Sequence, residues 1–148
     1  MKKEAMQKHP EEWFFLHNFD IDRVFSTIQR ADYFVLYYIK MQQEDRPDEK
    51  LYLSDLAKAM GIKVTELSKG IEKLQDNGYV RWLTDREAGR TYVELTSKAV
   101  ELMAEERDFM KRCYARLQAE VGDEELHRTV STLQKLTGIL KEEREENR

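Results

Sequence analysis

Apolar residues recur along the chain at two spacings, and the changes between them mark the elements that we expect. From residue 51 to 76 the apolar positions repeat every three or four residues, as on one face of an α-helix. From 79 to 95 they alternate with polar positions, as in half-buried strands. After 97 the helical spacing returns. The pattern therefore predicts short helices, then a β-hairpin, then long helices.

The segment 51–76 predicts two short helices joined by a tight turn. The first, "LYLSDLAKAM", has Ser54 as its expected cap and Gly61 as its end. The second lies within "KVTELSKGIEKLQD" and ends at Asn77-Gly78. Their apolar faces are formed by Leu53, Leu56 and Met60, and by Leu67, Ile71 and Leu74. Two such helices with a glycine at the corner outline a helix-turn-helix.

The next segment predicts a β-hairpin. "YVRWL" and "RTYVEL" each alternate apolar and polar residues, and the connector "TDREAG" is polar and ends in a glycine. The apolar face of the hairpin should pack on the preceding helices. The loop should remain in water.

Helices are expected on both sides of this central region. Residues 11–41 contain no Gly or Pro and predict two helices, with a break near 18–20 or near 26–29, ending before Pro47. A long helix should run from a cap at Thr96 to about residue 120, where Gly122 ends it. Asp123 is the expected cap of a last helix, followed by a frayed tail at 141–148. The apolar side of that last helix comprises Leu126, Val130, Leu133, Leu136 and Leu140.

Length and composition narrow the class of protein. A chain of 148 residues fits a single domain, which we divide into N-terminal helices at 1–45, the helix-turn-helix with its hairpin at 51–96, and C-terminal helices at 97–148. No apolar run approaches the roughly 20 residues that a bilayer requires, and the first residues contain no apolar signal core, so we expect no membrane contact and a cytoplasmic location.

The charge and the reactive residues narrow the class of protein further. The net charge of −4 argues weakly against a nucleic-acid partner, although residues 51–96 carry 7 basic and 7 acidic groups. Cys113, the single cysteine, cannot form an internal disulfide, and His9, His17 and His127 are scattered. No nucleophile motif, phosphate loop or metal-ligand spacing occurs, so we expect no enzyme, no cofactor and no metal site.

The order of these segments resembles the MarR family of bacterial winged-helix regulators and the related SarA-like staphylococcal proteins, over roughly residues 28–120. "YFVLYYI" is similar to the helix that precedes the DNA-binding motif in that family. "LSDLAKAMGI" resembles its first motif helix, "VTELSKGIEKLQDNGYV" its recognition helix, and "DREAGRTYVELT" its wing. All four segments occur in order and at suitable separations.

The resemblance implies a mostly α-helical fold with a small β-hairpin wing, in which a winged helix-turn-helix is flanked by N- and C-terminal dimerisation helices. It also implies a homodimer that regulates transcription. The recognition helix would enter the major groove of double-stranded DNA, and the wing would reach the adjacent minor groove. Two-fold symmetry then predicts an inverted-repeat operator.

The outward face of the expected recognition helix supplies candidate DNA contacts. Burial of its apolar side leaves Lys63, Thr65, Glu66, Ser68, Lys69 and Lys73 exposed. Thr65, Glu66, Ser68 and Lys69 suit base edges, and Lys63 and Lys73 suit phosphates. An ordinary solvated face is the structural alternative. The corresponding functional alternative is a winged-helix dimer that binds other proteins and not DNA.

In the expected wing, Asp85 matches the family aspartate that holds the tip, and either Arg86 or Arg90 matches its arginine. An arginine at the tip would be attracted by the strongly negative potential of a narrow minor groove. The structural alternative is a solvated hairpin with an Asp85–Arg90 ion pair.

Many aromatic residues lie before residue 39. Family members bind phenolic or lipophilic effectors between these helices and the DNA-binding motif, which suggests an aromatic effector pocket. Its candidate residues are Phe19, Phe25, Tyr33, Phe34 and Tyr37. Packing in the core or at a dimer interface explains the same residues more simply.

Overall fold

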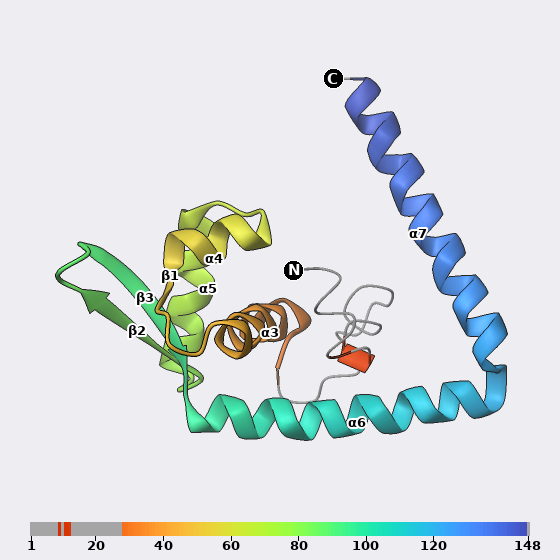
Figure 1. The fold of residues 1–148 in the computed structure, drawn as a ribbon, viewed down its shortest axis with the longest axis horizontal. Helices are drawn as coiled ribbons and strands as arrows, with labels where there is room; N and C mark the ends of the chain where they lie inside the picture. Colours follow the sequence, from red (N-terminus) through yellow and green to blue (C-terminus); the bar gives the residue numbers. More distant parts are fainter. Residues whose placement is uncertain (1–8, 10, 13–27, 148) are drawn as a thin grey trace. The chain divides into compact units, whose positions relative to one another are not determined.

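The structure is a computed structural model, and it describes residues 9, 11, 12 and 28–147. The described part is mostly helical with one small antiparallel sheet, which confirms the expected fold class (Figure 1). The elements in chain order are α3 (Arg30–Asp45), β1 (Leu51–Tyr52), α4 (Leu53–Met60), α5 (Val64–Asp76), β2 (Val80–Asp85), β3 (Arg90–Leu95), α6 (Ser97–Val121) and α7 (Asp123–Glu146).

The described residues fall into two compact units. Residues 28–106 form the winged-helix unit, and residues 107–147 with the short piece at 9–12 form the C-terminal unit. Helix α6 begins in the first unit and ends in the second. The helix break expected near 18–20 lies outside the described residues. Helix α3 ends at Asp45, before Pro47, as expected.

The core of the winged-helix unit is formed where α3, α4 and α5 pack with the sheet. Helix α5 buries Leu67, Ile71 and Leu74, the three residues that its spacing predicted. Other residues of the core include Tyr33, Leu36, Ile39, Leu56, Ala57, Val80, Val93, Ala99 and Met103. Burying each large aliphatic side chain contributes about 1.5–3 kcal/mol, so this core fixes the orientation of α5.

The turn between α4 and α5 follows the sequence closely. Gly61 takes a positive φ of 70°, and its N–H donates to the carbonyl of Lys58 at 3.2 Å. This conformation strains any residue with a Cβ, so glycine ends α4 here. The expected cap is wrong, because α4 begins at Leu53 and Tyr52 precedes it without a side-chain capping bond. Ser54 therefore lies inside the first turn.

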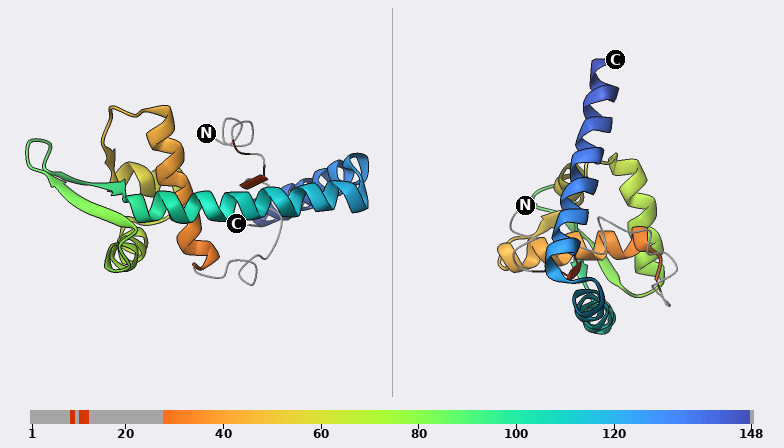
Figure 2. Two further views of the ribbon diagram at one scale, coloured as in Figure 1. Left: turned by 90° about the horizontal axis from the view of Figure 1, so that it is seen from below. Right: turned by 90° about the vertical axis from the view of Figure 1, so that its right-hand side faces the viewer.

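The sheet has the order β1-β3-β2, and the expected hairpin is formed by β2 and β3. Its register runs from Val80↔Leu95 to Asp85↔Arg90, and residues 86–89 make the turn. Strand β1 was not expected; it adds a third strand through Leu51↔Val93 and Tyr52↔Tyr92. The end of the hairpin projects past α4 and α5 in Figure 1 and in the left view of Figure 2.

The long helix α6 begins as predicted. Thr96 Oγ1 accepts a hydrogen bond from the backbone N–H of Ala99 at 3.3 Å and donates to the carbonyl of Gly78 at 2.6 Å. Thr96 therefore caps α6 and joins its start to the end of α5. Gly122 ends the helix with a φ of 92°. None of the helices in the described part of the chain combines the length and the hydrophobicity that a bilayer crossing requires.

Helix α7 differs from its prediction at both ends. Gly122 precedes it without a side-chain cap, and Asp123 accepts a hydrogen bond from Gln118 Nε2 at 2.8 Å, so Asp123 does not act as the expected cap. The helix continues to Glu146, so the tail expected to fray is helical. One cause is local bonding, since Asn147 Nδ2 donates to the carbonyl of Glu143 at 2.8 Å.

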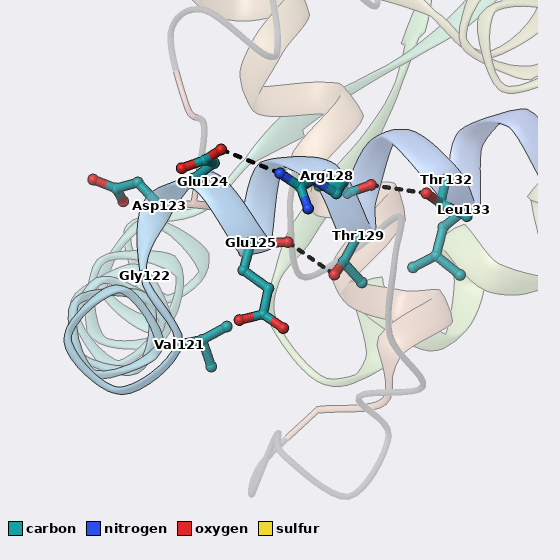
Figure 3. A pocket seen from close by; sticks show the side chains of 9 residues that line it. All are labelled: Val121, Gly122, Asp123, Glu124, Glu125, Arg128, Thr129, Thr132 and Leu133. Carbon is teal, nitrogen blue, oxygen red and sulfur yellow. Dashed lines mark hydrogen bonds and ion pairs between the residues drawn. The ribbon is translucent and has the colours of Figure 1, made fainter.

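An open groove of about 830 Å³ lies at the corner between α6 and α7 (Figure 3). It is lined by Val121, Leu133 and polar residues of the first turns of α7. Two of the interactions drawn there lie within the helix: Arg128 pairs with Glu124 at 3.1 Å, and the Thr129 hydroxyl donates to the carbonyl of Glu125 at 2.9 Å.

Candidate nucleic-acid interface

The polar face of α5 is exposed opposite its buried side. Lys63, just before the helix, and Thr65, Glu66 and Lys69, in its first half, are all exposed. Lys63 is the residue before the first turn, and its side chain makes no capping bond. These groups are therefore available to a ligand. They present two cations together with donors and acceptors for base edges.

Ser68, a further candidate, is half-buried. Its hydroxyl donates to the carbonyl of Val64 at 2.7 Å. Because the hydroxyl proton is used within the helix, the oxygen can still accept a hydrogen bond. Ser68 is thus available to a ligand only as a hydrogen-bond acceptor.

Lys73, the remaining candidate on α5, contacts α3. Its Nζ lies 2.9 Å from Asp32 Oδ2 and 3.3 Å from Gln29 Oε1. This partly exposed pair contributes less than about 1 kcal/mol, but it compensates the charge of the lysine. Lys73 is therefore joined to the helical core, unlike Lys63 and Lys69.

The wing is joined to α5 by one side chain that the sequence did not single out. Gln75 Oε1 accepts a hydrogen bond from the backbone N–H of Trp82 at 2.8 Å. Trp82 lies on the edge strand β2, so this bond satisfies a backbone donor that the sheet leaves unpaired.

Asp85 is the centre of a polar cluster at the end of β2. One carboxylate oxygen accepts from the Tyr52 hydroxyl at 2.7 Å and from Lys50 Nζ at 3.2 Å, and the other accepts from the backbone N–H of Ala88 at 3.2 Å. The side chain is only 11% exposed. The Tyr52 hydrogen bond, followed by the bonds from Ala88 and Lys50, lowers the pKa of Asp85 from 3.8 to about 2.

The same contacts act on the neighbouring groups. The hydrogen bond to Asp85 raises the pKa of Tyr52 and of Lys50. The ionised Asp85 thus favours the protonated, hydrogen-bond-donating forms of the tyrosine hydroxyl and the lysine ammonium.

Arg90, at the start of β3, is held by the first turn of α4. Its Nη2 donates to Ser54 Oγ at 2.6 Å and to Asp55 Oδ2 at 3.1 Å. The carbon of its guanidinium lies 4.0 Å from the centre of the Tyr52 ring, a cation–π contact. The Asp85–Arg90 ion pair of the structural alternative does not form, because the two residues are opposite each other in the sheet but their side chains bind different partners.

Arg86 is in a different situation. It is exposed in the turn, and its side chain has no hydrogen bond or ion pair within the described part of the chain. The structure therefore distinguishes the two wing arginines, which the sequence could not: Arg90 is bonded to α4, and Arg86 is exposed without such a bond.

Sequence reasoning missed four residues of this cluster: Lys50, Tyr52, Asp55, and Ser54 in its actual role. The alternation in "LYL" could have indicated the short strand β1 that brings Tyr52 to the hairpin. The contacts themselves join residues 33 to 36 positions apart, which no local pattern reveals.

The candidate effector residues are only partly described. Tyr33 and Tyr37 are buried, and Phe34 stacks on Tyr38 with ring centres 6.0 Å apart. Phe19 and Phe25 lie outside the described residues. The effector pocket stays a prediction. Within the described ranges, no group of three or more His, Cys, Asp or Glu side chains could hold a metal ion.

Comparison with solved structures identifies the class of fold. The chain is similar to the Staphylococcus aureus regulator MepR in a DNA complex, with a TM-score of 0.57 and 20% identity over 95% of this chain and 88% of that one. It is also similar to the oxidised form of MarR from E. coli, with a TM-score of 0.58 and 16% identity over 90% and 92% of the two chains.

A third similar structure is MepR bound to ethidium bromide, with a TM-score of 0.53 and 21% identity over 93% and 89% of the two chains. No protein-family model and no curated protein matches the sequence. The structural similarity confirms the winged-helix fold that the resemblance to the MarR family implied.

Proposed function

We propose that this protein is a transcriptional regulator that binds double-stranded DNA through α5 and the hairpin. The observation that carries the proposal is the exposed polar face of α5, supported by a buried core in a fold shared with a solved protein–DNA complex. An α-helix fits the major groove of B-DNA, and a projecting hairpin fits the adjacent minor groove.

The chemistry of the α5 face supports a division of contacts. Lys63 and Lys69 form no ion pair among the described residues and suit phosphates, although Lys69 was expected at a base edge. Glu66 can accept from a cytosine amino group. Thr65 and Ser68 add a donor or acceptor. Lys73 was expected to bind phosphate, and its pair with Asp32 makes it the weaker candidate.

We propose a homodimer, because α7 has no residue buried in this chain. Its exposed apolar residues include Leu133, Leu136, Ile139 and Leu140. A second copy would cover them and would place two α5 helices on one duplex. A two-fold dimer of this kind predicts an inverted repeat, with half-sites about one helical turn apart.

Selection of bound sequences from a pool of random duplexes tests the proposal. We expect an inverted repeat to emerge, and its affinity to fall steeply between about 50 and 200 mM salt. Lys69→Ala should weaken all duplexes similarly, whereas Glu66→Gln should relax the preference at one base pair of each half-site. Failure of the wild-type protein to retard any duplex at low salt would overturn the proposal.

A small aromatic or lipophilic effector is a further part of the proposed function. Its support is the cluster of α3 aromatic rings and the ethidium bromide bound to MepR. Ethidium added to the DNA-free protein should raise its melting temperature, and Tyr37→Ala should remove that increase. A shift that survives Tyr37→Ala would place the ligand elsewhere.

One observation favours a second candidate function. The balance of 7 basic and 7 acidic groups in residues 51–96 would also suit a winged-helix dimer that binds another protein. That candidate predicts capture of a protein partner with no DNA retardation at low salt.

As a bacterial transcription regulator, the protein would act in the cytoplasm.

A further inference from the structure

The two wing arginines have different surroundings, and we infer that they have different tasks: Arg86 enters the minor groove, while Arg90 is a positioning residue that holds the hairpin against α4. The inference rests on the proposed DNA-binding function. It names the side chain that reads the minor groove, together with the side chains that present it.

Arg90 is engaged on three sides. Its guanidinium donates to Ser54 at 2.6 Å and to Asp55 at 3.1 Å, and it lies over the Tyr52 ring at 4.0 Å. Entry into a groove would require all three contacts to break. The charge of Arg90 is also compensated by Asp55, so the negative potential of DNA would attract it less than an unpaired cation.

Tyr52 contacts both strands of the hairpin where they meet the turn. Its hydroxyl donates to Asp85, the last residue of β2, and its ring contacts Arg90, the first residue of β3. Asp85 and Arg90 are opposite each other in the sheet. Both ends of the turn 86–89 are therefore held in place: Asp85 before it is bonded to β1, and Arg90 after it is bonded to α4.

Arg86 follows this base directly and remains available. Two carboxylates adjoin Arg86 along the chain: Glu87 forms no ion pair with it among the described residues, and Asp85 already accepts hydrogen bonds from Tyr52, Lys50 and Ala88. With its oxygens so occupied, Asp85 does not capture the neighbouring arginine. Arg86 is the only basic residue of the turn. A cation on a short, anchored turn loses little freedom on binding, which favours insertion in a narrow groove.

Salt dependence separates the two tasks. On the duplex with the highest affinity in the selection, Arg86→Ala should lower the slope of log K against log salt by about 0.9 per wing. Arg90→Ala and Tyr52→Phe should weaken binding while the slope stays that of the wild-type protein. Arg81→Ala, which removes another arginine of the same hairpin, is the matched control and should change neither quantity. Arg81 pairs with Glu94 at 3.0 Å.

A base analogue tests the groove directly. Substituting 2,6-diaminopurine for adenine adds an amino group in the minor groove and keeps the major-groove pattern. At the positions beneath the wing, this change should weaken wild-type binding about tenfold and leave Arg86→Ala unaffected. Arg90→Ala and Tyr52→Phe should keep part of the sensitivity, because Arg86 is still present.

The outcomes distinguish this inference from the proposed function. A wild-type protein that binds no duplex removes both. A wild-type protein that binds, with a reduced slope and lost analogue sensitivity in Arg90→Ala but not in Arg86→Ala, overturns the inference alone. Thermal melting checks each fold. Arg86→Ala removes no hydrogen bond or ion pair among the described residues, and Tyr52→Phe provides a conservative test of the anchor if Arg90→Ala fails to fold.

Discussion

Helices α5 and α7 have the same kind of sequence and different surroundings. Both are amphipathic, and the same spacing predicted both. Helix α5 buries Leu67, Ile71 and Leu74 within its own chain, whereas α7 buries no residue and leaves Leu136 51%, Ile139 59% and Leu140 71% exposed. The spacing thus predicts a helix and its apolar face. It does not say which chain supplies the surface that covers that face.

The energetic difference is large. Each large aliphatic side chain left in water forgoes about 1.5–3 kcal/mol of stabilisation. Propensity alone does not compensate, because most helical stability in proteins comes from the packing of an apolar face. Helix α5 is stabilised by its own unit. We expect α7 to be stabilised by a second copy of the chain.

The largest expected effect comes from placing charge on the exposed face of α7. Leu136→Asp with Leu140→Asp should weaken dimerisation at least about 1,000-fold, because four leucines per dimer lose burial and four carboxylates resist it. Sedimentation velocity should show a monomer at concentrations where the wild-type protein is a dimer. The winged-helix unit should stay folded by circular dichroism.

Gln134→Asp, on the polar side of the same helix, is the control and should remain a dimer. If the double variant sediments as the wild-type dimer, the interface lies elsewhere. If the wild-type protein is itself a monomer, the second-copy explanation of α7 fails, and residues of the same chain must cover it.

The second effect concerns the core beneath α5. Ile71 is fully buried, so Ile71→Ala should destabilise the protein by about 2–5 kcal/mol through lost burial and a cavity. Urea unfolding measures it. Lys69→Ala, two residues earlier on the exposed side, should stay within about 0.5 kcal/mol of the wild-type protein. Equal effects of the two substitutions would contradict the burial of this face.

The same contrast explains how much of the fold was predictable. The end of α4 at Gly61, the buried face of α5 and the cap at Thr96 were correct, because each depends on residues within one or two turns. Strand β1 was missed, because two residues give too short an alternation and their pairing with β3 is distant in sequence. The outward face of α5 was predictable from its buried face.

The wing was only partly predictable. The position of Asp85 and of both arginines near the turn followed from the alternating pattern. The partners of Arg90 did not, since Ser54 and Asp55 lie in another element, and Ser54 was itself assigned to a cap. Local patterns place a side chain on an element. They do not show which distant group has already bound it.

The third prediction uses pH, because the wing is anchored by polar contacts, whereas α7 exposes an apolar face. The pKa of Asp85 is lowered from 3.8 to about 2, so its contribution to stability is complete above about pH 5 and is lost as pH falls through the range between these pKa values. The stability advantage of the wild-type protein over Asp85→Asn should be constant from pH 7 to 5 and shrink towards pH 3.

Urea unfolding at each pH measures this advantage. The stability advantage of the wild-type protein over Tyr52→Phe should decline in the same way as pH falls, since this substitution removes the main cause of the lowered pKa of Asp85. The Leu136→Asp/Leu140→Asp monomer should retain the decline, because the cluster lies in the other unit. An advantage that grows as pH falls would contradict the ionised, hydrogen-bonded Asp85.

The smallest expected effect comes from adding one methyl group to α5 or to α7. Gly70 lies in the middle of α5 and Gly138 in α7, and a Cβ at either position would meet nothing within 4 Å in this chain. Gly70→Ala should therefore stabilise the protein by about 0.5–1 kcal/mol through helix propensity, measurable as a small rise in melting temperature. Gly138→Ala should stabilise the Leu136→Asp/Leu140→Asp monomer similarly. In the wild-type background any loss of stability from the Gly138 methyl must come from a second copy packed against α7, whereas a loss from Gly70→Ala would contradict the open surface of α5.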